Sequence, residues 1–343
     1  MITRKKRIDW IDLAKGLTII LVVLGHSTGN GLLGVIVHDV IYSFHMPLFF
    51  ILSAMTCKLS ISDDDFKYNT IKSAKHLLLP YAITHVIRIL WVDDIAVFNS
   101  IDYWKSALFT CIFSSGSNFD YYGIQVYSII SWFFCVLFFC RTIYDYIHLK
   151  IENENIFFIC ICMCSFMGEG IGIVQRLPFS IDIALASLLF LYFGRYLHSI
   201  NVSEQPFKKI LLWGFIWVLT FFIIKPNFHD SIVLAMAGRV YPLFPICFIT
   251  GIAGTMIIVE FSAICCTAIK TLCKPMIYLG KNSLYLLCIH SLDEKISIYF
   301  ESDSHLIMFI KRLVIDLLIF IIVMVIKSII TKIKNIVSIQ HPI

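Results

Sequence analysis

Two side chains in the first apolar segment, residues 8–27, have types and a spacing that could support catalysis. Lys15 and His26 are eleven residues apart. In a helix this separation is about three turns plus 20°, so both side chains project from one face, about 16 Å apart along the axis. Asp12 lies one turn before Lys15, near the same line. An imidazole can be tuned around neutral pH, so His26 is suited to act as a general base or a relay in a site that excludes water.

Ionisable groups at membrane depth are costly and are usually functional, so this polar stripe needs an explanation. One alternative is structural: Asp12 and Lys15 would anchor the end of a helix by snorkelling to the interface. That alternative leaves His26 unexplained, because it lies far along an otherwise apolar segment. We therefore predict that Asp12, Lys15 and His26 form the catalytic part of a site.

Five segments, taken in order, resemble the motifs of the acyltransferase-3 family, whose members are integral membrane O-acyltransferases and often acetylate bacterial surface glycans. The first motif is D-x-x-K-G-x9-H, formed by Asp12, Lys15, Gly16 and His26. The second usually ends in Gly, and here Ala54, another small residue, takes its place. The last four segments are FFILSA at 49–54, SWFFCVLF at 131–138, LPFSIDIALASLLFLYFGRYL at 177–197 and YLGKNSLYLLCIH at 278–290.

The resemblance implies a donor and the residues that bind it. It implies that acetyl-CoA, or another acyl-CoA, is a donor substrate and that no cofactor is permanently bound. The family has a basic residue, ten intervening residues and a His on its first helix, which Lys15 and His26 match. Lys72 and Lys75 stand just before the third predicted helix, where the family places basic residues. With Lys15 and Arg88 they are candidates for binding the coenzyme, and Arg88, a charge at membrane depth, should face a cavity or pair with an acid.

Seven further side chains are candidates for lining the same cavity. His45 precedes Pro47, which bends a helix and frees a carbonyl four residues back, so His45 either lines the cavity or satisfies that carbonyl. Ser283 and His290 are about two turns apart and share a face, which either points inward or makes a polar interhelical contact. The candidates are His45, Ser53, Trp132, Asp182, Asn282, Ser283 and His290.

Some of these candidates have simpler explanations. Ser53 is more typical of an interhelical hydrogen bond than of a nucleophile, and Trp132 is typical of aromatic packing. Asp182 and Glu169 are intramembrane acids, so each either belongs to the site or pairs with Arg88 or Arg195.

Composition excludes a soluble enzyme. The chain has 343 residues, of which 59% are hydrophobic and 15% are charged, and its mean hydropathy is +0.84. These values predict an all-α integral membrane protein in which residues 1–343 form a single transmembrane domain. The net charge of +5 is modest and follows membrane topology, so no nucleic-acid partner is expected. The twelve cysteines lie mostly in apolar runs without zinc-ligand spacing, so neither a disulfide framework nor a metal site is expected.

Apolar runs of near-spanning length predict a bundle of about ten transmembrane helices. Lys and Arg residues cluster at alternate connections, which predicts that both termini are cytoplasmic. The basic start of the chain resembles a signal peptide, but no small-residue cleavage site follows, so the first helix should be retained. The predicted spans are 8–28, 35–57, 74–97, 124–148, 155–173, 178–198, 208–225, 241–264, 276–293 and 307–331.

The longest external connection, residues 98–122, contains a short apolar piece, 107–113, that is too brief to span a membrane. Four residues after it, Asn118, Asp120, Tyr121 and Tyr122, have the aromatic and polar character of carbohydrate contacts. Aromatic residues also settle at membrane interfaces for structural reasons, so both interpretations stay open.

The leading hypothesis is a multi-pass O-acyltransferase of the bacterial inner membrane. It would transfer an acetyl group from cytosolic acetyl-CoA to a hydroxyl of a cell-surface polysaccharide or of its lipid-linked precursor. A non-enzymatic exporter of glycans or lipid-linked sugars is the alternative from another class, and a peptide or lipid acceptor is a third. A carrier would not require the His26 imidazole on the same helical face as the Lys15 cation, whereas an acyltransferase would. This pair therefore favours the enzyme hypothesis.

Overall fold

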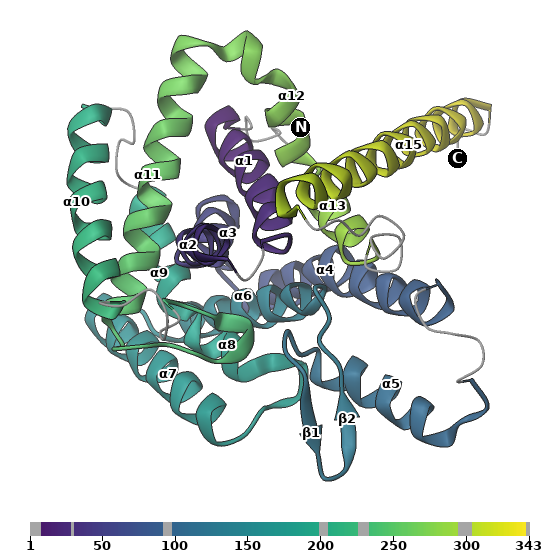
Figure 1. Cartoon of the computed structure of the whole chain (residues 1–343), viewed down its shortest axis with the longest axis horizontal. Coiled ribbons are helices and arrows are strands. Elements are labelled where there is room, and N and C mark those ends of the chain that lie inside the picture. The colour runs from purple at the N-terminus through teal and green to yellow at the C-terminus, as the bar shows by residue number, and fades with distance from the viewer. Residues whose placement is uncertain are drawn as a thin grey trace.

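The computed structural model describes residues 8–28, 31–91, 98–198, 205–225, 233–293 and 304–340. Helices dominate this part of the chain, and one two-stranded hairpin interrupts them (Figure 1). The elements of the first half are α1 (Asp9–Gly25), α2 (Leu32–Tyr42), α3 (His45–Thr56), α4 (Asp63–Trp91), α5 (Ile101–Phe113), β1 (Phe119–Tyr121), β2 (Ile124–Val126) and α6 (Trp132–Lys150). The elements of the second half are α7 (Glu154–Val174), η2 (Pro178–Ser180), α8 (Ile181–Ala186), α9 (Leu188–His198), α10 (Pro206–Ile224), η3 (Met236–Gly238), α11 (Ile246–Ala268), α12 (Lys270–Lys281), α13 (Ser283–His290) and α15 (His305–Gln340).

Several helices of the described ranges are long and apolar enough to cross a membrane, as expected for an all-α integral membrane protein. They number six, or seven if the bent pair 178–186 and 188–197 forms one span. The predicted count of ten is therefore not confirmed. Three predicted spans fall short for visible reasons. α1 has only 17 residues, α4 carries Lys75, His76, His85 and Arg88 within the predicted span, and the segment 270–290 is broken at Asn282.

Breaks in the helices coincide with polar or proline residues. The predicted helix 35–57 is divided into α2 and α3 at Ser43 and Phe44, four and three residues before Pro47. Proline removes a backbone donor and clashes with the carbonyl four residues back, so an interruption at Ser43 is expected. The predicted helix 178–198 bends by 49° at Ser187, between α8 and α9. The first of these breaks places the start of α3 beside the end of α1.

α1 packs closely along α12 because two glycines remove side chains from the contact. A Cβ at Gly16 would lie 2.1 Å from the carbonyl oxygen of Met276, and a Cβ at Gly280 would lie 1.7 Å from that of Asp12. Backbones this close exclude any larger residue. The contact fixes the position of α1 along α12, and therefore the position of His26 at the far end of α1.

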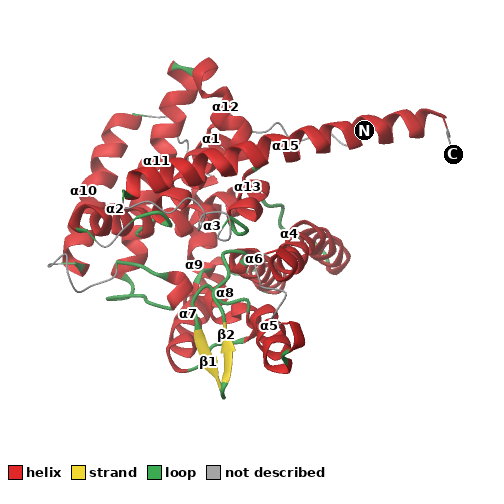
Figure 2. Cartoon of the chain, turned by 45° about the vertical axis from the view of Figure 1, so that its right-hand side comes forward, coloured by secondary structure: helices red, strands yellow, loops and turns green. Residues whose placement is uncertain are grey.

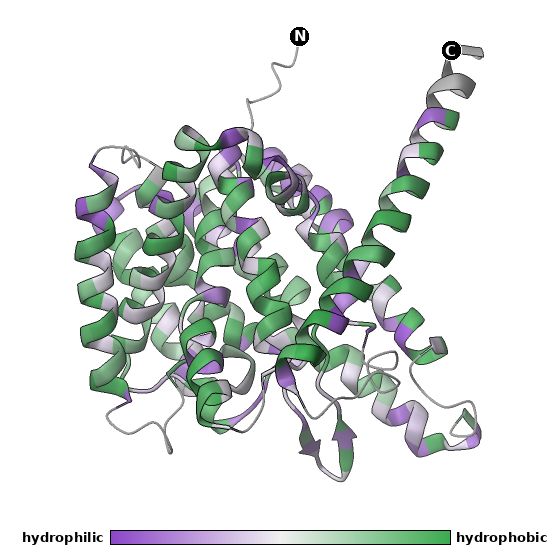
Figure 3. Ribbon diagram, turned by 45° about the horizontal axis from the view of Figure 1, so that its top comes forward, coloured by the Kyte–Doolittle hydropathy of each residue, from purple (hydrophilic) through white to green (hydrophobic). Residues whose placement is uncertain are grey.

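α15 runs antiparallel to α1. Arg312, near the start of α15, donates to the carbonyl of His26 at the end of α1, whereas Lys327, fifteen residues later, bonds to Asn282. Figure 3 shows α15 as a mostly hydrophobic helix that extends away from the bundle. The start of α1 and the later part of α15 therefore lie at the same end of the molecule.

The opposite end carries α5 and the hairpin (Figure 2). Strands β1 and β2 pair antiparallel, with Phe119 opposite Val126 and Tyr121 opposite Ile124. The prediction of a helix beginning at residue 124 is therefore wrong, because residues 124–126 form β2 and α6 begins at Trp132. The predicted short apolar piece lies within α5.

A buried ion pair ties this end to the bundle. Arg239 Nε lies 2.7 Å from Asp182 Oδ2, and both side chains are almost fully buried. The prediction that Asp182 pairs with Arg88 or Arg195 is wrong, because a connecting segment brings in a third cation. Arg195 instead donates to the carbonyl of Cys57.

Candidate functional site

His26 lies at the end of α1, where it contacts α2 and α13. It caps the helix, and its carbonyl accepts a hydrogen bond of 2.9 Å from Arg312. Its Nδ1 lies 3.4 Å from the hydroxyl oxygen of Tyr42, and its ring centroid lies 5.4 Å from that of His290. The His26 side chain is exposed, so its ring borders open space and can meet a ligand.

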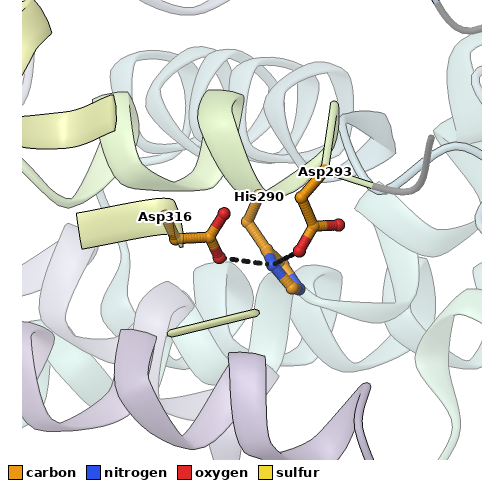
Figure 4. A group of neighbouring side chains, drawn as sticks. All are labelled: His290, Asp293 and Asp316. Atoms are coloured by element: carbon orange, nitrogen blue, oxygen red, sulfur yellow. Dashed lines mark hydrogen bonds and ion pairs between the residues drawn. The ribbon is translucent and has the colours of Figure 1, made fainter. Parts of the chain in front are cut away.

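His290 is held by two carboxylates (Figure 4). Its Nδ1 lies 2.9 Å from Asp316 Oδ2 and 3.2 Å from Asp293 Oδ2. Arg312 binds both carboxylate oxygens of Asp293, at 2.9 and 2.7 Å. His290 and Asp316 are fully buried, and Asp293 nearly so. The end of α13 and the start of α15 thus build one closed polar group, the His290 cluster, formed by His290, Asp293, Arg312 and Asp316.

The charges of the His290 cluster balance when one further proton is bound, on the His290 imidazole or on the Asp316 carboxyl. Two carboxylates and one guanidinium leave one negative charge, and a buried uncompensated charge is strongly unfavourable. A proton on each nitrogen of His290 neutralises the cluster, with Nδ1–H donated to Asp316. Nε2 then carries the second proton, and this buried atom has no hydrogen-bond partner among the described residues. With the further proton on its imidazole, His290 is a cationic donor whose ring centre lies 5.4 Å from that of His26.

Three members of the cluster, His290, Asp293 and Asp316, have ligand atoms within 4.8 Å of one another. This spacing could admit a divalent ion. Arg312 already engages both oxygens of Asp293, however, and leaves only His290 and Asp316 available. A guanidinium this close would also repel a cation. The chemistry of the donor set fits a proton on His290 better than a metal.

A cavity of about 270 Å³ opens beside His26. We call it the His26 cavity. His38, Tyr42 and His45 form one wall, and their rings are stacked or in edge contact with Tyr42 at the centre. The other lining residues come from α1, α3, α13, the start of α6 and the segments beside the hairpin and η3; they include Val22, Met46, Phe49, Gly116, Ser128, Trp132, Phe133, Met236, Gly238 and Leu287.

Of the two alternatives considered for His45, the structure supports the position at the cavity. Its Nδ1 lies 3.0 Å from the carbonyl oxygen of Ile41, which also accepts from the Phe44 amide, and not from the carbonyl of Ser43, four residues before Pro47. Its side chain also lines the His26 cavity. Trp132 lines this cavity as well. The break before Pro47 thus places the His45 imidazole against the ring of Tyr42, whose hydroxyl contacts His26.

A second cavity, of about 630 Å³, lies between α4, α13 and α15. We call it the α4 cavity. Lys75 and His76 line it at one end, and Asp293 of the His290 cluster lines it at the other. Most of the wall is apolar and includes Leu79, Pro80, Ile83, Ile87, Trp91, Leu284, Cys288, Ile289, Leu292, Ile319 and Val323. Leu287 faces the His26 cavity, whereas Cys288 and Ile289 face the α4 cavity. α13, which ends at His290, therefore separates the two cavities.

Cations from four helices gather at the Lys75 end of the α4 cavity. Lys72, one turn before His76, is exposed, as are Lys75 and His76 themselves. Three more charges act electrostatically on His76, from α1, α6 and α15: Lys15, Arg141 and Lys327. Lys15, one of the predicted site residues, therefore lies near this cationic group.

Asp12 lies far from His26 along α1, and Arg88 lies far from Lys75 along α4. Asp12 is fourteen residues from His26, about 21 Å along the helix, and lies at the contact with Gly280. It cannot orient the imidazole, because the helix is rigid over that length. Arg88 is thirteen residues from Lys75, about 20 Å along α4, and lines neither cavity.

The remaining predicted residues have mainly structural positions. Asn282 donates to the carbonyl of Tyr278 and accepts from Lys327, at the break between α12 and α13. Ser53 and Ser283 are buried but line neither cavity. Asp182 belongs to the ion pair with Arg239 described above.

The sequence analysis missed three members of the His290 cluster and one neighbour of His26. A signal for Asp316 was present, because it is a single acid within the apolar run 307–331. Asp293 and Arg312 lie near the ends of predicted spans, where charges are ordinary, so no local signal marks them. No local sequence signal distinguishes Tyr42 either, because aromatic residues are common in membrane helices.

A family model described as an acyltransferase domain matches residues 8–332, nearly the whole chain. No curated protein and no solved structure matches the chain at a significant level.

Proposed function

Because the chain belongs to the acyltransferase-3 family and is a membrane acyltransferase, we propose that it acetylates a glycan. The donor would be cytosolic acetyl-CoA, and the acceptor would be a hydroxyl of a cell-surface polysaccharide or of its lipid-linked precursor. One observation carries the proposal: two cavities lie on different sides of α13, and His26 lines one while Asp293, which contacts the buried His290, lines the other. A two-substrate transfer needs this arrangement, because donor and acceptor must meet at one point.

The α4 cavity suits the donor. The phosphates of a coenzyme A need cations, which Lys15, Lys72 and Lys75 supply near one end. The pantetheine arm is long and largely apolar, as is the wall that leads from Lys75 to Asp293. In this position the thioester would arrive beside the His290 cluster.

The His26 cavity suits the acceptor, and the chemistry then follows from the two imidazoles. In this mechanism Nδ1–H of His26 donates to the Tyr42 hydroxyl oxygen, so Nε2 is unprotonated and takes the proton of the acceptor hydroxyl. The hydroxyl oxygen attacks the thioester carbonyl, and the oxyanion that forms accepts the Nε2–H of His290. When the C–S bond breaks, the coenzyme sulfur leaves and takes the proton from His26. The products are an acetyl ester and free coenzyme A.

The same proposal places the protein in a bacterial inner membrane with both termini cytoplasmic. α1, α4 and the broken pair α12–α13 would cross the membrane in addition to the seven segments above, which restores ten spans. Basic residues support this orientation, because they concentrate at the ends of helices remote from the hairpin. Examples are Lys58, Lys150, Lys208, Lys209, Lys270 and Lys332. Asp9 at the start of α1 pairs with Lys270 at 2.7 Å.

We expect Lys15→Met to weaken acetyl-CoA binding by about tenfold, because a charge near the phosphates is removed at similar side-chain length. Lys15→Arg keeps the charge and should retain measurable binding and transfer. Isothermal titration of acetyl-CoA against purified protein in nanodiscs measures the difference without any acceptor. If Lys15→Met binds acetyl-CoA as tightly as the parent, the donor role of Lys15 is wrong.

Tyr42→Phe should lower the turnover number about fivefold and leave acetyl-CoA affinity unchanged. The variant loses one hydrogen bond to His26, worth about 1 kcal/mol, and keeps the ring that stacks on His38. Tyr127→Phe, which alters another tyrosine hydroxyl near the hairpin, is the matched control and should behave like the parent. Equal turnover in Tyr42→Phe and Tyr127→Phe would remove Tyr42 from the site.

A further inference from the structure

A third hollow, of about 660 Å³, lies beside the hairpin and is used by nothing described so far. We call it the hairpin cleft. One wall is the hairpin, and the other is formed by the end of α7 with the two residues that follow it and by Gly238 and Arg239. The lining residues are Phe119, Asp120, Tyr121, Tyr122, Gly172, Ile173, Val174, Gln175, Arg176, Gly238 and Arg239.

The walls of the hairpin cleft carry an exposed ring and exposed hydrogen-bonding groups. Tyr122 is 88% exposed, and Asp120 and Gln175 are exposed as well. The Arg176 guanidinium lies 4.4 Å from the centre of the Phe119 ring. A sugar ring presents C–H groups to aromatic faces and hydroxyls to carboxylates, amides and guanidinium groups, so this mixture suits carbohydrate.

Arg176 retains bonding capacity toward a ligand. Its Nη1 donates to Ser115 and Ser117, at 2.8 to 3.0 Å, and no carboxylate pairs with it in the described part of the chain. Partial burial and then the charge of Arg239 lower the pKa of Arg176, against the opposing effect of Asp182. Its remaining N–H groups can therefore bind hydroxyl oxygens.

Packing of the hairpin does not require Tyr122. Tyr121 supplies the packing, because its ring lies 4.7 Å from that of Phe113 and 5.6 Å from that of Phe109. The turn is closed by Asp120, whose Oδ1 accepts from the Gly123 amide at 2.9 Å. Tyr122 contacts only the Tyr121 ring among the aromatic residues described, and projects outward.

The hairpin cleft adjoins the His26 cavity. Gly238 lines both hollows, and on either side of it Ala237 faces the cavity and Arg239 faces the cleft. A Cβ at Gly238 would lie in ordinary van der Waals contact, 3.6 Å from Cγ2 of Val240, so alanine fits at this point. One extended molecule could therefore occupy both hollows.

We propose that the hairpin cleft is a second sugar subsite, so that the acceptor is an oligosaccharide or polysaccharide chain and not a single sugar. One sugar would lie at His26 and another, further along the same chain, would lie against Tyr122 and Arg176. This inference rests on the proposed function for the identity of the acceptor, but the binding it predicts can be measured without catalysis.

The test uses the host cell's surface polysaccharide, partially hydrolysed and separated into single repeat units and longer fragments. Saturation-transfer NMR with the purified full-length protein in nanodiscs measures the affinity of each fraction. The longer fragments should bind about tenfold more tightly than single repeat units, a difference of about 1.4 kcal/mol, because only they can fill the second subsite. Labelled acetyl-CoA is then added to the same samples to measure transfer.

Two pairs of variants locate the effect. Tyr122→Ala should abolish the advantage of long fragments, whereas Tyr122→Phe keeps the ring and should retain it. Gly238→Leu should also abolish the advantage, because its side chain fills the junction, whereas Gly238→Ala fits in the space available and should retain it. The subsite is supported if Tyr122→Ala and Gly238→Leu lose the affinity advantage of long fragments while Tyr122→Phe and Gly238→Ala retain it.

Other outcomes separate this inference from the proposed function. Length-dependent binding without any acetyl transfer would overturn the proposed function and support the subsite. Transfer with equal affinity for single units and long fragments would overturn the subsite and leave the proposed function standing. No binding of any fraction, or a length advantage that survives Tyr122→Ala and Gly238→Leu, would likewise overturn the subsite.

Discussion

His26→Ala is expected to lower acetyl transfer by about 10³-fold or more, because it removes the group that takes the acceptor proton. The expectation follows from its exposure to the cavity and from its contacts with Tyr42 and His290. Mass spectrometry of the glycan from cells that express the variant measures the loss. The amount of protein in the membrane fraction should equal that of the parent, since an exposed side chain contributes little to packing.

A control and a contrary result make this prediction decisive. His148→Ala changes a histidine at the end of α6, remote from both cavities, and should acetylate normally. Near-normal acetylation by His26→Ala would remove His26 from the mechanism.

Asp316→Asn is expected to lower turnover by about 100-fold or more, even though the side chain never touches the substrate. The carboxylate holds Nδ1 of His290 at 2.9 Å and supplies the negative charge that keeps the imidazole protonated. An amide of the same shape removes that charge, so the cationic donor to the oxyanion is lost; removing the acid behind a catalytic histidine is known to be this damaging. The affinity for acetyl-CoA should change little, so the defect should be confined to the turnover number.

The matched control for Asp316→Asn is Glu260→Gln. Glu260 is an equally buried acid, on α11, and its partner is Lys209. Both variants replace a buried carboxylate by a neutral amide, but only Asp316 belongs to the His290 cluster. Comparable turnover in the two variants would show that Asp316 acts on the fold and not on the reaction.

The sequence predicted the long apolar helices well. α7, α10 and α11 begin and end within a few residues of the expected spans, because a membrane span of hydrophobic residues leaves few alternatives. It was least accurate where two signals competed. In residues 35–57 the hydrophobic run hid the break before Pro47, and at residue 124 it hid the strand that follows the turn at Gly123.

The candidate site was predictable on one helix and not between helices. Helical periodicity placed Lys15 and His26 on one face of α1, because that relation depends only on local geometry. The contact between His290 and Asp316 depends on how α13 packs against α15, and no local sequence pattern predicts that packing. Asp12 was selected by the same periodicity, but periodicity carries no information about partners on other helices, and the structure leaves it about 21 Å from His26.

The most direct test of the central claim separates the two substrates by a membrane. The protein is reconstituted in liposomes in one orientation, with labelled acetyl-CoA on the face that carries Lys75 and polysaccharide fragments on the hairpin face. We predict labelled acetyl esters on the fragments, an equal amount of free coenzyme A thiol on the donor face, and neither product with His26→Ala. Export of fragments without release of thiol, or transfer only when both substrates share one face, would contradict a reaction at the meeting point of the two cavities.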